Sequence, residues 1–210
     1  MNDYLLILFV TILSYLLGSI PTGYIIGKLK GIDITKQGSG NIGMANVFRT
    51  LGPIYGITVL LLDASKGFIP TFIAIELNFP LLVILLVGIF SILGHIFSIF
   101  LGFKGGKGVA TAAGMFLAIS PILTLSSFLV WLTTVLLTRY SSLGSILACL
   151  WACFLVLLYQ FELIKISLLT FYTAQKAYFC VFVILISIFI IFKHRDNIVR
   201  IIKNQEKKLF

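Results

Sequence analysis

Residues 109–138, VATAAGMFLAISPILTLSSFLVWLTTVLLT, decide how many times this chain crosses a membrane. As one helix the stretch would be about 45 Å long, against roughly 30 Å of hydrocarbon in a bilayer. As two helices, split at Ser120 and Pro121, each half is short for a span. Length alone therefore leaves two topologies open, and the charges elsewhere in the chain must choose between them.

The rest of the chain has the composition of a polytopic membrane protein. Its 210 residues are 60% hydrophobic and only 11% charged, which is more apolar surface than a soluble domain needs. Further apolar runs extend to the end of the chain, at residues 5–26, 53–77, 80–100, 143–159 and 178–192. The first run is therefore expected to be a retained span rather than a signal peptide. No stretch between the runs is long enough to bury a core of its own. We expect an all-α protein with a single transmembrane domain, residues 1–210.

The distribution of Lys and Arg favours the split. With seven spans and the N-terminus outside, thirteen basic residues face the cytoplasm, two (Lys165 and Lys176) face outward, and Lys66 lies within a span. Without the split, eight basic residues lie on one side of the membrane and seven on the other, and this even division predicts no orientation. Because basic residues hold loops in the cytoplasm, we predict seven transmembrane helices, a cytoplasmic C-terminus and a location in the cytoplasmic membrane. The thirteen are Lys28, Lys30, Lys36, Arg49, Lys104, Lys107, Arg139, Lys193, Arg195, Arg200, Lys203, Lys207 and Lys208.

This topology brings three polar stretches to the cytoplasmic face: residues 28–49, residues 101–108 and the tail from Lys193. The net charge of +9 comes from 16 Lys and Arg against 7 Asp and Glu. The basic residues are scattered among membrane segments, so no nucleic-acid partner is expected. The positive charge fits both a topogenic role and an anionic substrate.

Residues 101–108, LGFKGGKG, combine glycines with lysines between two apolar runs. Glycines let a backbone turn several N–H groups toward one point, and lysines add positive charge, a combination suited to holding a phosphate. An ordinary loop between membrane helices has the same composition. The stretch is not a nucleotide-binding P-loop, because Gly108 follows Lys107 where that motif needs Ser or Thr. His95, just upstream, is either a buried polar group or an organiser of this loop.

Residues 38–43, GSGNIG, fit the dinucleotide fingerprint G-x-G-x-x-G. That fingerprint needs a preceding strand and a βαβ unit, whereas apolar runs flank this copy, so dinucleotide binding is rejected. Glycines before a helix start still present N–H groups to an anion. Ser39, Asn41 and Asn46 add short polar groups, and Arg49 adds a charge. The alternative is a flexible loop with a topogenic arginine.

Two smaller patterns involve charged or polar pairs. Asp63 and Lys66 lie inside an apolar run at i, i+3 spacing, where charges are costly unless paired. We expect a structural ion pair, with a proton or ion pathway as the alternative. Ser142, near Arg139, either donates to a phosphate or packs helices closely.

The tail opens with His194, Asn197 and Arg200, which share a face if the segment is helical. An interfacial helix and an ordinary basic tail both fit this pattern. No His-x-x-x-x-Asp box follows His95 or His194, and no Gly-x-Ser-x-Gly elbow occurs. No cluster of His, Cys and carboxylates indicates a metal, so neither a metal nor a cofactor is expected.

Taken together, three motifs resemble the bacterial acyl-phosphate:glycerol-3-phosphate acyltransferase family. They are GSGNIGMANVFR at 38–49, Gly94 and His95 followed by FKGGKGVAT at 103–111, and HRDNIVR at 194–200 with Glu206 beyond. LDASKG at 62–67 is also similar, and the resemblance covers nearly the whole chain. Met44 and Ala45 stand where the family usually has Ala and then Thr or Ser, Ser98 where Pro is common, and Asn204 in place of a usual Gly. Asn at that last position is tolerable because it accepts left-handed backbone angles.

The resemblance implies that a fatty acyl group passes from an acyl phosphate to the sn-1 hydroxyl of glycerol-3-phosphate. The products are 1-acyl-glycerol-3-phosphate (lysophosphatidic acid) and inorganic phosphate. An acyl phosphate already carries a good leaving group, so positioning and charge neutralisation remain for the enzyme. The expected partners are the two substrates and the lipid bilayer, without an obligatory protein partner.

Roles follow for the residues of the three motifs. Phosphate is expected to be cradled by Lys104, Lys107, Gly105, Gly106 and Gly108. The second phosphate and the reacting carbonyl are assigned to Ser39, Gly40, Asn41, Asn46 and Arg49. Glycerol-3-phosphate is assigned to His194 and Asn197 with Ser142, and Glu206 is expected to be structural. The general base stays open between His95, His194 and the substrate's own phosphate.

A different class of protein would use the same cations. A transporter of an organic phosphate needs a path through the bilayer, where Asp63 and Lys66 would be suspect. A non-catalytic membrane subunit would show neither transport nor chemistry.

Overall fold

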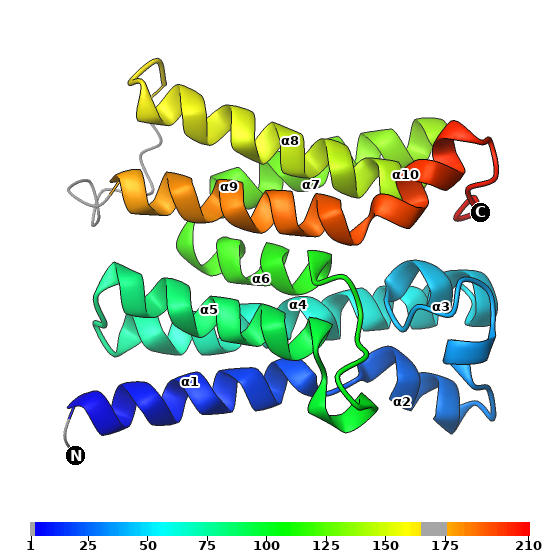
Figure 1. Ribbon diagram of the computed structural model, residues 1–210, viewed down its shortest axis with the longest axis horizontal. Coiled ribbons are helices and arrows are strands. Elements are labelled where there is room, and N and C mark those ends of the chain that lie inside the picture. Colours follow the sequence, from blue (N-terminus) through cyan, green and yellow to red (C-terminus); the bar gives the residue numbers. More distant parts are fainter. Residues whose placement is uncertain (1–2, 165–175) are drawn as a thin grey trace. The chain divides into compact units, whose positions relative to one another are not determined.

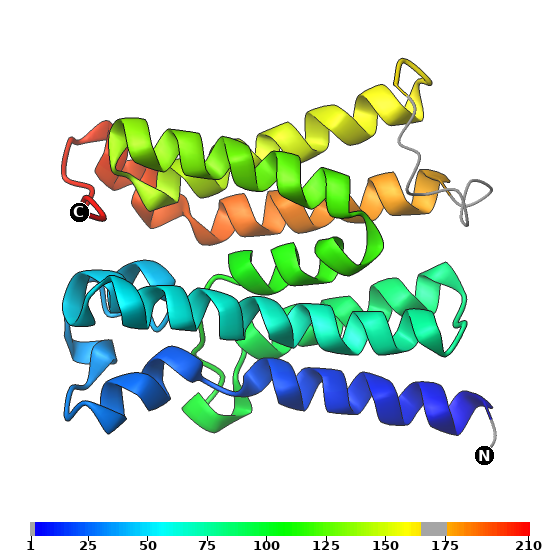
Figure 2. The ribbon, with the colours of Figure 1, turned by 180° about the vertical axis from the view of Figure 1, so that it is seen from behind.

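The computed structural model describes residues 3–164 and 176–210, so the predicted outward-facing Lys165 lies outside the described residues. Within those ranges all regular structure is helical. The chain forms two compact units, Met1–Ala118 and Ile119–Phe210. Figures 1 and 2 show the helices of each unit from two opposite sides.

The first unit contains six α-helices and two short 3₁₀ turns among its described residues. The α-helices are α1 (Asp3–Ser19), α2 (Thr22–Leu29), α3 (Met44–Leu51), α4 (Pro53–Glu76), α5 (Leu81–Ile96) and α6 (Val109–Ile119), the last of which ends one residue into the second unit. The 3₁₀ turns are η1 (Ile34–Lys36) and η2 (Ile99–Leu101). The second unit contains α7 (Pro121–Thr138), α8 (Ser141–Gln160), α9 (Lys176–Lys193) and α10 (Arg195–Ile202).

Six described segments are long and apolar enough to cross a membrane. They are residues 3–29, 53–76, 81–101, 121–138, 141–160 and 176–193. The predicted break in residues 109–138 is confirmed, because α6 ends at Ile119 and α7 begins at Pro121. Proline fits the first position of a helix, where its missing N–H would have no partner anyway. The 11 residues of α6 make it about 16 Å long, shorter than the hydrocarbon core.

Small residues set the packing of the first unit. A Cβ added at Gly67 or Gly114 would overlap the backbone of the other helix, so α4 and α6 cross with their backbones in close approach. Close backbone approach at small residues is the usual way that membrane helices associate. Ser14 of α1 donates to the Val87 carbonyl of α5 at 2.6 Å, fully buried. These contacts join α4 to α6 and α1 to α5 within the first unit.

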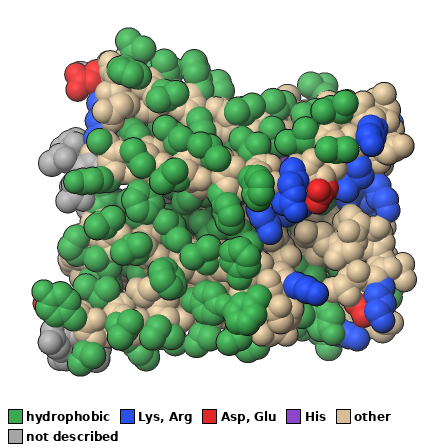
Figure 3. All heavy atoms as spheres, viewed as in Figure 1, with side chains coloured by type: hydrophobic (Ala, Val, Ile, Leu, Met, Phe, Trp, Pro, Cys, Tyr) green, Lys and Arg blue, Asp and Glu red, His purple; other side chains and the backbone are tan. Residues whose placement is uncertain are grey.

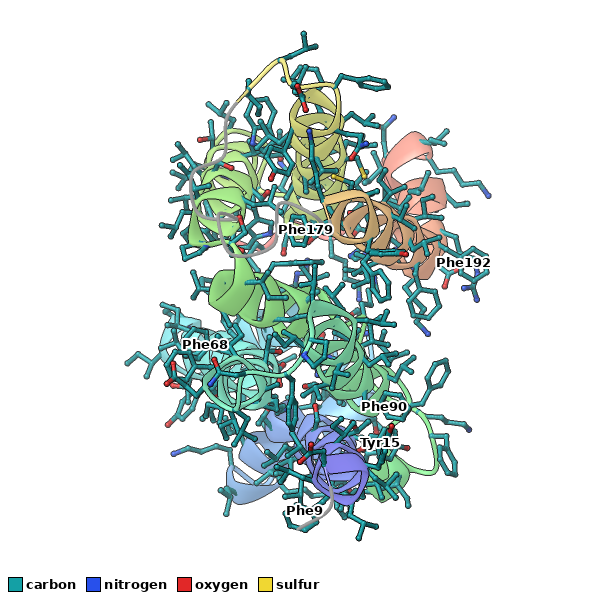
Figure 4. All side chains as sticks on the ribbon, turned by 90° about the vertical axis from the view of Figure 1, so that its left-hand side faces the viewer. Phe9, Tyr15, Phe68, Phe90, Phe179 and Phe192 are labelled. Atoms are coloured by element: carbon teal, nitrogen blue, oxygen red, sulfur yellow. The ribbon has the colours of Figure 1, made fainter. Side chains whose placement is uncertain are left out.

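The outer surfaces suit lipid. Phe9 and Phe192 are 55% and 58% exposed and lie on the outside of their helices, whereas Phe179 is 1% exposed and lies inside (Figure 4). Figure 3 shows hydrophobic side chains along the helices and Lys and Arg side chains gathered toward helix ends. This is the pattern of a protein whose middle lies in hydrocarbon and whose ends lie in water.

Candidate active site

The glycine-lysine loop at 102–108 is pinned to the end of α5. The amide of Gly105 donates to the Ile96 carbonyl and the amide of Gly106 to the His95 carbonyl, both at 3.0 Å. These carbonyls belong to the last turn of a helix and have no partner within it. Both amides therefore have intramolecular acceptors, and the role of these two glycines in holding a phosphate stays a prediction. Gly102 (φ 59°) and Gly108 (φ 83°) take left-handed backbone angles that favour glycine.

Gly106 is a glycine because His95 occupies the space of a side chain. A Cβ added there would lie closer than 3.0 Å to His95 Nε2. The imidazole is 6% exposed, and its Nδ1 lies 3.6 Å from Asp63 Oδ1 on its other side. His95 thus lies between the loop and a carboxylate of α4, as expected of an organiser of the loop.

The predicted ion pair between Asp63 and Lys66 is present and buried. Lys66 Nζ lies 2.5 Å from Asp63 Oδ1, and the two side chains are 3% and 6% exposed. The ammonium also donates to the Ile20 carbonyl at 2.6 Å and to Thr22 Oγ1 at 3.2 Å, and Thr22 donates to Asp63 Oδ1 at 2.5 Å. An ammonium has three protons, and all three have acceptors here. Sequence reasoning missed Thr22; the neighbouring Pro21, which breaks the first apolar run, was the available signal.

The loop at 38–43 is held by Asn46 rather than offering Asn46 to a substrate. Asn46 is 1% exposed, its Oδ1 accepts from the Ser39 amide at 2.7 Å, and its Nδ2 donates to the Ile34 and Gln37 carbonyls at 3.2 and 3.0 Å. Asn46 therefore shapes the loop, and its role in binding phosphate stays a prediction. Asn41 Oδ1 accepts from the amide of Gly43, the residue before α3, at 2.8 Å.

Other predicted site residues of the two loops are exposed or half-buried. Ser39 is exposed, and Gly40, which has a φ of 72°, is half-buried. Arg49 lies in the last turn of α3 and is half-buried. Lys104 is exposed and Lys107 half-buried in the other loop. Both views of the ribbon place the two loops toward the end of the first unit that is opposite the N-terminus (Figures 1 and 2).

The second unit carries the third motif around one carboxylate. Glu206, whose side chain is 3% exposed, accepts hydrogen bonds from Ser142 Oγ at 2.7 Å, Asn197 Nδ2 at 2.6 Å and Arg200 Nε at 2.8 Å. Burial raises the pKa of Glu206, but these three bonds and the charge of Arg200 outweigh it and hold the pKa below its usual range. The hydroxyl proton of Ser142 is thus directed to Glu206, which differs from the predicted donation to phosphate.

Three further residues of the tail have defined conformations or contacts. Asn204 has a φ of 55°, so it adopts the left-handed conformation expected where the family usually has glycine. His194 Nδ1 lies 2.8 Å from the Ile190 carbonyl, which can only accept, so Nδ1 carries a proton. The backbone of Leu209 donates to the Arg139 carbonyl at 2.7 Å, a closure of the C-terminus that the sequence did not indicate.

The candidate residues therefore divide between the two units. Ser39, Arg49, His95, Lys104 and Lys107 belong to the first, and Ser142, His194, Asn197 and Glu206 to the second.

The model of one protein family, described as glycerol-3-phosphate acyltransferase, matches residues 8–204. This chain belongs to the glycerol-3-phosphate acyltransferase family.

Individual members of the glycerol-3-phosphate acyltransferase family align with almost the whole chain. The enzyme of that name from Aquifex aeolicus (strain VF5) is 45% identical over 202 residues, covering 96% of this chain and 98% of the relative. The one from Geobacter sulfurreducens is 40% identical over 201 residues, covering 96% of each. The family resemblance predicted from the three motifs is thereby confirmed.

Two solved structures of an integral membrane glycerol-3-phosphate acyltransferase, PlsY (YgiH), share the fold. Its glycerol-3-phosphate form has a TM-score of 0.82 and 44% identity, covering 96% of this chain and 94% of that one. Its lysophosphatidic acid form has the same TM-score and 43% identity. With six helices of spanning length in the part of the chain that the structure describes, this member of the family is likewise a multi-pass integral membrane protein.

Proposed function

We propose that this protein transfers a fatty acyl group from an acyl phosphate to the sn-1 hydroxyl of glycerol-3-phosphate at the cytoplasmic face of the membrane. Membership of the family supports the acceptor and the acyl transfer. The observation that supports a phosphorylated donor is the pair of glycine-rich loops at one end of the first unit, each with its own cations. Two loops with cations beside them suit two phosphate-bearing reactants, and an acyl phosphate is a donor that supplies the second phosphate.

The chemistry requires little beyond positioning and charge. The sn-1 oxygen attacks the acyl carbon, the bond from that carbon to the phosphate oxygen breaks, and the phosphate leaves with the electron pair. Lys104 and Lys107 neutralise the leaving phosphate, while Ser39, Asn41 and Arg49 hold the second phosphate and polarise the carbonyl. His194 and Asn197 orient glycerol-3-phosphate.

The general base is proposed from among His95, His194 and the phosphate of a substrate. The enclosure of His95 between Asp63 and Gly106 favours His194 or a substrate phosphate as the acceptor of the proton from the attacking hydroxyl. His194 is suited to the task because Nδ1 donates to Ile190, which directs Nε2 away from that carbonyl.

The orientation in the membrane is part of the proposal. We count the short helix α6 as a membrane helix, which brings the total to seven. The N-terminus then lies outside and the C-terminus in the cytoplasm. The excess of Lys and Arg on one side supports this topology. A topology reporter fused after Phe210 is expected to be active only inside the cell, and activity only outside would overturn the orientation.

Purified protein in detergent tests the reaction. Acyl phosphate, acyl-CoA and acyl carrier protein are each offered with and without glycerol-3-phosphate. We expect release of inorganic phosphate from acyl phosphate only when glycerol-3-phosphate is present, with little product from the two thioesters. Product from a thioester alone would refute the donor, and the absence of any acyl transfer would refute the enzyme. Uptake of an organic phosphate into liposomes without chemistry would instead indicate a transporter, which the fully engaged ammonium of Lys66 disfavours.

A further inference from the structure

We propose that Asp63 and Lys66 are positioning residues of the reaction: their buried ion pair fixes the two glycine-rich loops relative to one another. The inference rests on the proposed function insofar as the loops hold the two substrates. Both residues lie on α4, and neither reaches the exposed part of either loop. Their contacts lead to one loop through α2 and to the other through His95.

The first connection runs from Lys66 to the loop at 38–43. The chain is broken between Ser19, the last residue of α1, and Thr22, the first of α2, so the Ile20 carbonyl accepts from the Thr22 amide at 3.0 Å instead of from an amide four residues on. Lys66 Nζ is a second donor to this carbonyl, at 2.6 Å, and also donates to Thr22. A broken membrane helix needs such partners, because hydrocarbon offers none.

Gly23, the residue after Thr22, lies close to the backbone of the 38–43 loop. A Cβ added at Gly23 would overlap the Ile42 carbonyl and lie 3.1 Å from Val47 Cγ2. The start of α2 therefore packs directly against the backbone of the 38–43 loop. A shift of Thr22 carries Gly23 with it, and the loop must follow.

The second connection runs from Asp63 to the loop at 102–108. Asp63 Oδ1, which accepts from Lys66 and Thr22, also faces His95 Nδ1 at 3.6 Å. The opposite edge of the imidazole fills the space beside Gly106, and the His95 carbonyl holds the Gly106 amide at 3.0 Å. The position of the imidazole thus sets the position of the loop.

One carboxylate oxygen is therefore shared by groups that lead to both loops. A buried ion pair is weak evidence for stability, since apolar residues of similar volume are often as stable. Apolar residues have no directional contacts with which to fix α2 against α4, whereas the hydrogen bonds from Thr22 and Lys66 to one oxygen do, and the same oxygen faces the His95 ring of α5 at 3.6 Å. Positioning therefore accounts for a charged pair at this depth better than stability does.

The test replaces both charges at once, because removing one partner alone would leave an unpaired buried charge. The variant is Asp63→Asn with Lys66→Met, and the control is Ser14→Ala, which removes a buried hydrogen bond between α1 and α5 elsewhere in the same unit. Thermal unfolding shows that each variant is folded. Hydrogen exchange followed by mass spectrometry then reports on residues 38–46 and 103–108, and initial rates are measured with each substrate varied.

In the double variant we expect faster exchange in both segments and a fall in kcat/KM of at least about tenfold for both substrates. Ser14→Ala is expected to leave both segments protected and kcat/KM within about twofold. A folded double variant with wild-type protection in either segment would overturn the inference. Loss for one substrate alone would overturn it as well.

A second variant covers the case in which the double variant does not fold. Thr22→Val removes the hydroxyl that joins Asp63 to α2 but keeps the ion pair and the shape of the side chain. It is expected to speed exchange at 38–46 and not at 103–108; unchanged exchange at 38–46 would refute the connection. Wild-type turnover in the same assay reports on the proposed function separately, because the exchange measurements need no catalysis.

Discussion

Substituting Gly106 by Ala tests whether the glycine-lysine loop is placed by the His95 ring. The new methyl group would lie closer than 3.0 Å to Nε2 and at 3.0 Å from both Cδ2 and Cε1. The ring cannot retreat, because it is buried and Asp63 lies on its other side. The φ of Gly106 is not positive, so steric overlap rather than backbone strain is the cause.

The loop must therefore move by about an ångström to relieve the overlap. Overpacking of this kind costs about 1–3 kcal/mol of stability. Misplacement of a catalytic group by about 1 Å can cost about a hundredfold in rate, or about 2.7 kcal/mol of transition-state stabilisation. We expect Gly106→Ala to remain folded and to lose about two orders of magnitude in kcat/KM.

Gly102→Ala is the matched control in the same loop. No atom lies within 4 Å of the added methyl group, but the φ of 59° makes alanine strained by about 1–2 kcal/mol. The two variants should therefore lose similar stability, measured by thermal unfolding. Only Gly106→Ala should lose most of its activity.

A double-mutant cycle with His95→Ala assigns the effect to the ring. Once the imidazole is absent, Gly106→Ala has room, and its further cost should fall to a few-fold. Residues in contact show such coupling, whereas independent sites are additive. Equal costs of Gly106→Ala with and without the ring would refute the reasoning, as would near-normal activity of the single variant.

Three further predictions concern other parts of the chain. The lowered pKa of Glu206 means that its ionised form adds stability above the unfolded pKa of about 4.3, and that this stability is lost as pH falls through the folded pKa. The melting temperature of the wild type should therefore fall more on acidification than that of Glu206→Gln. Parallel plots of melting temperature against pH would contradict this. Ser98→Ala should lower the free energy of unfolding by about 1 kcal/mol, because it loses the hydrogen bond to the Ser19 carbonyl. Ser98→Pro should lower it less, because proline fits the φ of −64° and restricts the unfolded chain. The reverse order of denaturation midpoints would contradict this. Arg49→Ala should abolish turnover of a protein that still folds, as checked by a cooperative thermal unfolding transition, and near-normal kcat in the purified variant would refute its role.

The parts of the fold that the sequence predicts well are those that depend on neighbours along the chain. Apolar runs predict helices, and the break before Pro121 depends on the residue itself. The pair Asp63 and Lys66 was predictable because i, i+3 spacing places both side chains on one helical face. Asn204 was predictable because its backbone angle depends on residue type.

The parts that the sequence does not predict depend on partners far along the chain. A short polar side chain indicates hydrogen bonding but does not say to what. Ser142 and Asn46 fit a phosphate site by composition, yet Ser142 bonds to Glu206, 64 residues away, and Asn46 to the backbone of its own loop. The glycines at 105 and 106 carry the same ambiguity, because a glycine that frees an amide and one that makes room for a ring look identical in a sequence.

The two buried carboxylates near the motifs also decide how much charge a substrate meets. Asp63 pairs with Lys66 and Glu206 with Arg200, so each acidic group is already balanced by a cation that does structural work. Lys104 and Lys107 of the 102–108 loop add positive charge to that of these two neutralised pairs. An incoming phosphate therefore meets a site whose local charge is positive, at the edge of a medium that screens charge poorly. On the proposed function, such a site favours the phosphate of glycerol-3-phosphate and the phosphate that leaves the donor, so charge balance within the protein contributes to this selectivity.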